Sequence, residues 1–388
     1  HTFSKYVAQK IQEYASSKKT EQAHKKATEQ TGLEFITSSF SGDLKFYTYN
    51  QKIGVLVLPT FMPSCLAFFG SPLRDFKDAL FYALNYAKEH NLEDLLIDVS
   101  SNGGGYVGLS YIVPMVLIQE WRDDVYAIYD YYDAVHSPQN NDYFNLTEGQ
   151  GFMNPATKVG YTDDGFYNDG VTMIRGGVSG TYSQRVYLDV MDPLFTAFLE
   201  APSYYFKNIM LLTDGLCGSA CSNFISIFQV YNKANVTSYG GLINEQMGTS
   251  SFSGGAVLEW SRYANILEKY GYTSANQLPT SATTSFTWVE NYMLNNSALP
   301  REFEKIIGNY HVNRWSPYDS GKIYKYVYAH YYGVDISTVP QNGTQDCNSK
   351  CAGFCVAAKC YCDFDMGGDD CDLPIANSLP AATQYQCE

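Results

Sequence analysis

The stretch Leu95-Leu96-Ile97-Asp98-Val99 is a short apolar run, typical of a strand that is buried on both faces of a sheet. It breaks at once into Ser100-Ser101-Asn102-Gly103-Gly104-Gly105. A second run of this kind, Asn208–Thr213, turns at Asp214-Gly215 into a helical pattern from about Ser219 to Asn232. Because buried strands alternate with helices, the sequence predicts an α/β fold with a parallel sheet.

The sequence on either side of these strands predicts further elements. A helical pattern runs from about Leu73 to His90, and Pro72 stands at its start, where proline is favoured. The apolar run from Val107 to Ile118 is short enough for a buried helix. Residues 121–190 are rich in Tyr, Asp and Gly and are interpreted as an insertion of irregular structure, and a helix is expected near 190–200. Earlier in the chain we expect a polar helix over 3–30 and strands at Leu33–Phe40, Leu44–Tyr49 and Ile53–Pro59.

The composition excludes several classes of partner. The chain has 388 residues, enough for two or three domains, and with 45% hydrophobic residues it can bury a sizeable core. Its net charge is −14 and its pI is about 4.8, so no basic surface is expected for nucleic acid or for an anionic membrane. The 34 tyrosines suit a binding groove, but the wet surface of an extracellular protein is the preferred explanation.

Cysteines and glycosylation motifs indicate an oxidising compartment. The ten cysteines favour disulfides, and no apolar run reaches the length of a membrane span. We therefore expect a secreted or cell-surface protein. The start at His1, without Met or a signal peptide, favours a processed or truncated product. N-glycans are expected at the four Asn-X-Ser/Thr motifs, which begin at Asn145, Asn235, Asn295 and Asn342.

The end of the chain carries a cysteine framework. Cys360-Tyr361-Cys362 is followed by Cys371, with Gly368 three residues before it. This spacing resembles the EGF-like module, in which disulfides supply the stability that a small core cannot. A zinc site is the alternative, but no histidine lies nearby and the glycosylation motifs favour oxidation. The resemblance implies the pairs Cys347–Cys355, Cys351–Cys360 and Cys362–Cys371.

A serine stands at the predicted strand-to-helix turn, in the segment Gly215-Leu216-Cys217-Gly218-Ser219-Ala220-Cys221. Backbone N–H groups at a helix N-terminus are unpaired and can stabilise an oxyanion while the hydroxyl attacks. The competing interpretation is that Ser219 simply caps the helix.

The glycine run at residues 103–105 changes this balance. Glycines allow backbone amides to approach a ligand closely. Two adjacent strand ends would then present N–H donors and a nucleophile to one crevice. A phosphate loop is the alternative, but no Lys-Ser/Thr follows the glycines and no G-x-G-x-x-G is present, so no cofactor is expected.

Both segments, in this order, resemble the C-terminal processing (tail-specific) protease family. The likeness is greatest to the branch of the chlamydial protease-like activity factor and its secreted eukaryotic relatives, which share the type of block found at Thr213–Cys221. Tyr239-Gly240-Gly241 and Gly254-Gly255 also fit that branch, and the resemblance covers about residues 50–310. It implies a crotonase-like parallel sheet with Ser219 as nucleophile. It also implies oxyanion N–H groups from Gly103 or Gly104 and from Ala220.

The resemblance also says where a general base should lie. One branch uses a Lys about 25 residues after the serine, but Ile243-Asn244-Glu245-Gln246 contains none. The other branch uses His, Ser and Glu. Glu302 lies in a block resembling Pro-x-Glu-Phe, which implies that it holds the imidazole in one tautomer; the alternative is a surface Glu at a helix start. We expect the base on an upstream or partner fragment of the same precursor, because none of the six histidines fits the motif: His1, His24, His90, His136, His311 and His330.

Four cysteines lie outside the EGF-like framework: Cys65, Cys217, Cys221 and Cys387. Their even number favours disulfides over a nucleophilic thiol. A Cys217–Cys221 bridge would brace the turn that presents Ser219, although pairing with Cys65 or Cys387 stays open.

The predicted organisation is a protease domain over 51–338 with an insertion at about 121–190. An N-terminal segment 1–50, a remnant of a PDZ-like or linker region, precedes it, and an EGF-like module at 345–373 and a tail at 374–388 follow. The predicted function is that of a secreted serine endopeptidase acting on an extended peptide. The alternative is an inactive relative serving as an adhesion, matrix or binding glycoprotein through its EGF-like module. An α/β-hydrolase esterase is weaker, since Gly-x-Ser-x-Gly is absent around Ser219.

Overall fold

The computed structural model describes residues 33–63, 72–175, 177–189, 196–241, 247–272, 278–279, 281–293, 299–304 and 306–312, with short pieces between 323 and 374. The helix expected over 3–30 lies outside these residues. The chain divides into two compact units, His1–Arg314 and Trp315–Glu388, a division that falls before the boundary expected at 338.

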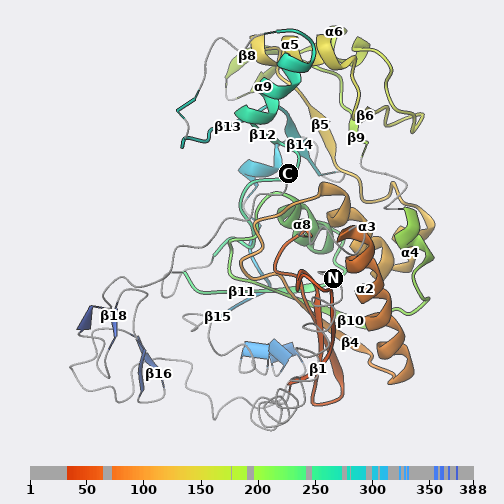
Figure 1. The fold of residues 1–388 in the computed structure, drawn as a ribbon, viewed down its shortest axis with the longest axis vertical. Coiled ribbons are helices and arrows are strands. Elements are labelled where there is room, and N and C mark those ends of the chain that lie inside the picture. The colour runs from red at the N-terminus through yellow and green to blue at the C-terminus, as the bar shows by residue number, and fades with distance from the viewer. Residues whose placement is uncertain are drawn as a thin grey trace, which may run out of the picture. The chain divides into compact units, whose positions relative to one another are not determined.

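A seven-stranded sheet forms the centre of the first unit (Figure 1). Its first three strands pair antiparallel, and every later neighbour pairs parallel. This confirms the predicted mixed α/β fold with a mostly parallel sheet. Residues 33–49, assigned to a separate N-terminal segment from the sequence, form the antiparallel edge of this sheet. In spatial order the strands are β1 (Leu33–Ser38), β2 (Lys45–Tyr49), β3 (Ile53–Val57), β4 (Asp94–Asp98), β10 (Asn208–Thr213), β11 (Asn235–Tyr239) and β15 (Tyr310–Val312).

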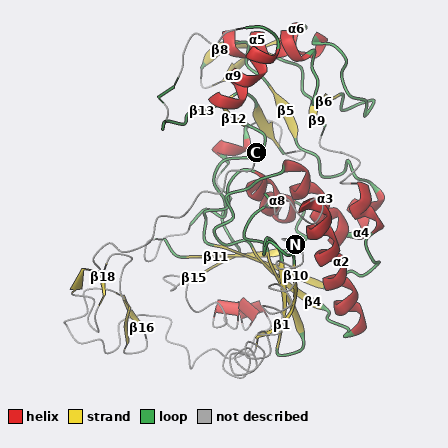
Figure 2. Cartoon of the chain, viewed as in Figure 1, coloured by secondary structure: helices red, strands yellow, loops and turns green. Residues whose placement is uncertain are grey.

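Three helices connect the parallel strands: α2 (Pro72–Glu89), α3 (Val107–Leu117) and α8 (Ala220–Val230) (Figure 2). In α2 the buried residues recur at helical spacing from Leu73 to Ala87, so one face packs on the sheet. Side chains of all three helices share a hydrophobic core with β4, β10 and β11. The other face of β4 and β10 is buried too, as Leu96 and Met210 show, which is why both strands are continuous apolar runs.

Residues 121–190, expected to be irregular, form short helices and two-stranded ladders. Together with residues 256–293 they enclose a second hydrophobic core built largely from aromatic side chains, such as Phe144, Phe152 and Trp288. Of the helix expected near 190–200, residues 190–195 lie outside the described part of the chain, residue 196 is helical, and a 3₁₀ turn, η1 (Ala197–Glu200), follows. The other elements of this region are α4 (Gln119–Asp123), β5 (Tyr131–Asp133), α5 (Pro138–Thr147), β6 (Phe152–Met153), α6 (Gly165–Asn168), β7 (Val171–Arg175), β8 (Val178–Tyr182), β9 (Tyr187–Leu188), β12 (Val257–Glu259), α9 (Trp260–Lys269), β13 (Ser285–Thr287) and β14 (Glu290–Tyr292).

The structure describes the second unit in a few helical residues between 323 and 331 and in two pairs of short strands. The strand β16 (Phe354–Val356) pairs antiparallel with β17 (Lys359–Tyr361), and β18 (Met366–Gly367) pairs with β19 (Leu373–Pro374). The cysteine pairing of the EGF-like module lies outside the described side chains and stays a prediction. No helix within the described ranges is long and apolar enough to span a membrane.

Candidate active site

The loops that follow β4 and β10 emerge side by side from one edge of the sheet. The two strands are parallel neighbours, with Leu212 opposite Asp98 in register. The Gly218 N–H donates to the Asn102 carbonyl over 3.1 Å, which ties the loops together. A second contact joins them, since the Ser101 N–H donates to Asp214 Oδ2. The glycine turn and the serine turn are 113 residues apart in the sequence at this contact, yet they share one site.

Ser219 has an unusual backbone at the start of α8. Its φ is 52° and its ψ is −126°, a conformation that costs a non-glycine residue about 1–3 kcal/mol. Its side chain makes no capping hydrogen bond, so the interpretation of Ser219 as a simple helix cap is wrong. The side chain is half-buried. A strained turn between a buried strand and a helix, with a serine hydroxyl that does not cap the helix, is the arrangement expected of a nucleophile.

Gly104 lies directly against this turn. A Cβ atom at this position would be 2.6 Å from the Ser219 Cβ and 2.7 Å from the Gly218 carbonyl oxygen. Its φ of +105° also disfavours any residue with a side chain. Only glycine allows the two loops to approach this closely.

Of the two glycines that were candidate oxyanion donors, the structure leaves only one with a free N–H group. The Gly104 N–H already donates to Asn102 Oδ1 over 2.9 Å. The N–H groups of Gly103 and Ala220 donate to no acceptor among the described residues. Ala220 is the first residue of α8, where backbone N–H groups lack partners within the helix. The available donors around Ser219 are therefore Gly103 and Ala220.

A disulfide joins Cys217 and Cys221 across this turn. This is one of the pairings that the sequence left open. Both cysteines are fully buried, and the bond removes both thiols as nucleophiles. Ser219 lies in the middle of the closed loop, so its backbone is fixed by covalent bonds on both sides. Cys65 and Cys387 lie outside the described residues.

Glu302 lies in a 3₁₀ turn, η2 (Arg301–Phe303), and binds a serine that sequence reasoning missed. Ser253 Oγ donates to Glu302 Oε1 over 2.7 Å. Ser253 is buried, and its backbone forms a parallel bridge with Ser219, whose N–H donates to the Phe252 carbonyl over 2.8 Å. The neighbouring pair Gly254-Gly255 was noted in the sequence, but nothing local marks the serine before it. A cavity of about 360 Å³ opens here, with Ser222, Phe252 and Glu302 in its wall.

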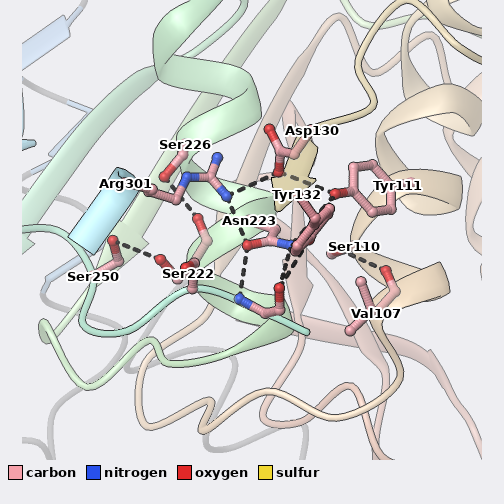
Figure 3. A network of polar contacts seen from close by, with 12 residues as sticks. Val107, Ser110, Tyr111, Asp130, Tyr132, Ser222, Asn223, Ser226, Ser250 and Arg301 are labelled. Carbon is pink, nitrogen blue, oxygen red and sulfur yellow. Dashed lines mark hydrogen bonds and ion pairs between the residues drawn. The ribbon is translucent and has the colours of Figure 1, made fainter. Parts of the chain in front are cut away.

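A buried polar network joins these segments (Figure 3). Arg301 Nη1 donates to Asn223 Oδ1 over 2.6 Å and to Asp130 Oδ2 over 3.1 Å. Asn223 Oδ1 also accepts from the Gly254 N–H over 2.9 Å, and the Tyr111 hydroxyl donates to Asp130 Oδ2 over 3.0 Å. Burial raises the pKa of Asp130 above its ordinary value, and the Arg301 charge opposes that rise. The network ties η2 and the 252–254 segment to α8.

The three histidines that the structure describes in the first unit have partners other than Ser219. His90 Nδ1 lies 2.9 Å from the Tyr86 carbonyl, and His136 Nε2 lies 2.7 Å from the Tyr167 carbonyl. His311 Nδ1 lies 2.9 Å from Ser238 Oγ, on β15 and β11. None of these three bonds to Ser219. His1 and His24 lie outside the described residues, as does the Ile243–Gln246 segment.

No family model and no curated protein matches the chain. Solved structures with a similar fold include a candidate peptidase from Parabacteroides merdae (TM-score 0.39, 15% identity, 79% of this chain and 68% of that chain). Mature CPAF (TM-score 0.35, 14%, 72% and 49%) and a candidate S41 protease from Bacteroides fragilis (TM-score 0.38, 10%, 78% and 58%) are similar to a comparable degree. The chain spans about half the length of these last two. Because all three TM-scores lie below 0.5, the function is inferred below from the residues of the site.

Proposed function

We propose that the chain is a serine peptidase with a crotonase-like catalytic domain and Ser219 as its nucleophile. The observation that carries this proposal is the backbone of Ser219: a strained turn between a buried strand and a buried helix, with a hydroxyl that caps nothing. Such strain persists only where the surrounding structure enforces it, and it clusters at functional sites. Here Gly104 and the Cys217–Cys221 disulfide enforce it.

The chemistry follows from the groups around this turn. Ser219 Oγ would attack a peptide carbonyl and form an acyl-enzyme. The N–H groups of Gly103 and Ala220 would hold the oxyanion, each contributing roughly 10²–10³ in rate. The cavity of about 360 Å³ beside the turn would accept a substrate side chain.

The proposal also covers where the enzyme acts, its substrate and its partners. A protein substrate, secretion and an EGF-like module that binds an extracellular partner fit the cysteine content and the glycosylation motifs. Asn145 and Asn235 are exposed, as an attached glycan requires. A histidine from an upstream or partner fragment, oriented by Glu302, would serve as general base.

A second candidate function is binding without catalysis, as an extracellular adhesion or matrix glycoprotein. The observation that favours it is that His90, His136 and His311 all bond elsewhere. Without a base, Ser219 would lose about 10²–10⁴ in rate.

The test is labelling of the natively purified protein with a fluorophosphonate, followed by peptide mapping. An adduct on Ser219, absent from Ser219→Ala and from heat-unfolded protein, is the expected result. A folded protein that takes no adduct at any pH between 4 and 9 would exclude the peptidase and leave the binding function.

The disulfide gives a second prediction for the same assay. The double variant Cys217→Ala/Cys221→Ala should lose about 2 kcal/mol of unfolding free energy. Its labelling of Ser219 should slow by about 10–100-fold, because small displacements of a nucleophile cost rate steeply. Labelling rate and urea midpoint are measured together. A variant that labels at the native rate would show that the turn holds Ser219 without the bridge.

A further inference from the structure

We propose that the cavity beside Ser219 selects substrates that carry a lysine or an arginine close to the scissile bond. The inference rests on the function proposed above, in which Ser219 attacks a peptide, and it names the class of peptide. The cavity volume of about 360 Å³ lies at the small end of the range for ligand pockets, about 300–1,000 Å³. We therefore expect it to hold one side chain rather than a length of peptide.

The cavity adjoins the serine turn on both sides of the nucleophile. Ser222, in its wall, lies three residues after Ser219, on α8. Phe252, also in its wall, accepts from the Ser219 N–H through its carbonyl over 2.8 Å. The N–H of Ser251, a third lining residue, donates to the Cys217 carbonyl over 2.9 Å. A side chain in the cavity would thus belong to a residue close to the bond that Ser219 attacks.

The wall of the cavity is acidic. Glu302 and Glu304 both line it, and the one cation among its lining residues is Arg301. Arg301 Nη1 donates to Asp130 Oδ2 over 3.1 Å, and both of these side chains are buried, so the charge of Arg301 is compensated inside the protein. The two glutamates therefore decide the sign of the charge that a ligand meets. A concave surface lined by one sign of charge attracts a group of the opposite sign.

The rest of the wall matches a long side chain with a charged end. Phe252 and Ile306 offer apolar surface to methylene groups, and an aromatic ring face also attracts a cation. Ser222 and Ser250 add hydroxyl oxygens, which lie 3.1 Å apart (Figure 3). Lysine and arginine end in groups that only donate hydrogen bonds, so carboxylate and hydroxyl oxygens are the partners that they need.

An acidic side chain is the alternative occupant, because Arg301 also lines the cavity. The Nε and Nη2 atoms of Arg301 are buried and have no hydrogen-bond partner among the described residues. The same burial keeps a ligand away from these two atoms, and Glu302 and Glu304 would repel a carboxylate. The charges of the wall therefore favour a basic occupant.

The first measurement digests a mixture of synthetic peptides of random sequence with the natively purified protein and maps the cut sites by mass spectrometry. We expect lysine and arginine to be enriched close to the cut, with kcat/KM about 10–10²-fold above that of matched peptides with glutamine at the same position. The enrichment should weaken at about 1 M salt, which screens the attraction. Ser219→Ala, purified in the same way, should cut nothing and so excludes a contaminating protease.

Glu304 is the residue to change, because Glu302 is assigned to orienting the base. Glu304→Gln should lower the preference for basic residues by about tenfold, and Glu304→Arg should shift the preference towards aspartate and glutamate. Glu268→Gln is the control, since Glu268 is exposed on α9 and is not among the residues that line the cavity. The quantity compared is the ratio of the rates for basic and neutral peptides, which a general loss of activity or stability does not change.

A second measurement needs no turnover of a peptide. Benzamidine, a small cation that resembles the end of an arginine side chain, should slow the fluorophosphonate labelling of Ser219 in the wild type. Benzamide, its neutral counterpart, should not. Glu304→Gln should be protected less by benzamidine than the wild type or Glu268→Gln.

The outcomes separate this inference from the function on which it rests. If Ser219 labels and the peptides are cut without enrichment of basic residues, or with enrichment of acidic ones, the specificity is wrong and the peptidase proposal stands. Equal preference in the wild type and in Glu304→Gln would overturn it as well. If Ser219 labels but no peptide is cut, a lack of protection by benzamidine overturns it in the same way. If the folded wild type neither labels nor cuts, the peptidase proposal fails and the specificity fails with it.

Discussion

Replacing Gly104 with alanine is expected to destabilise the chain by about 3–5 kcal/mol and to abolish the labelling of Ser219. The new Cβ would lie 2.6 Å from the Ser219 Cβ, 2.7 Å from the Gly218 oxygen and 3.0 Å from the Ala220 nitrogen. None of these atoms is the far end of a flexible side chain, so the serine turn itself would have to move. The positive φ of Gly104 adds strain of its own.

Gly103→Ala is the matched control, because a Cβ there meets nothing within 4 Å. We expect the control to unfold within about 1 kcal/mol of the wild type. Guanidinium unfolding gives both free energies, and fluorophosphonate labelling reports on the turn. A Gly104→Ala protein as stable as the control would mean that the two loops do not meet as closely as the structure has them.

The central sheet could be predicted because its signal is local. Leu95–Val99 and Asn208–Thr213 are apolar throughout, which follows from burial on both faces, and a helix follows each strand. The second core could not be predicted. It depends on aromatic contacts such as Phe144 with Trp288, and short elements carry too few residues to display a period.

Some residues of the candidate site could also be predicted from the sequence, and others could not. Ser219 and the glycine turn were found because each follows a buried strand directly, and parallel neighbouring strands bring their ends together. Ser253, Asn223 and Asp130 were missed, because each is a single polar residue whose burial depends on a distant partner. Which glycine keeps a free N–H was also beyond the sequence, since it depends on where the Asn102 side chain turns.

Replacing Arg301 with leucine should destabilise the protein by about 3–5 kcal/mol, because it leaves the Asp130 carboxylate buried without its counter-charge. Arg301 and Asp130 are each 4% exposed, so water cannot take the place of the lost partner. The exposed pair Lys207–Glu93 is the control, and Lys207→Ala should change stability little. The double variant Arg301→Leu/Asp130→Asn should recover much of the loss, since no unpaired charge remains.

The Arg301→Leu variant should also differ from the wild type in how its stability depends on pH. Burial raises the pKa of Asp130, and removing Arg301 removes the main influence that lowers it. A folded-state pKa above the unfolded value means that the native state binds the proton more tightly, so stability falls as the pH rises. Arg301→Leu should therefore be more stable at pH 5 than at pH 8 relative to the wild type, and the double variant should lose this dependence. If Arg301→Leu showed the pH dependence of the wild type, the carboxylate of Asp130 would not depend on Arg301. The segment that carries Glu302 would then have to be held against α8 by other contacts.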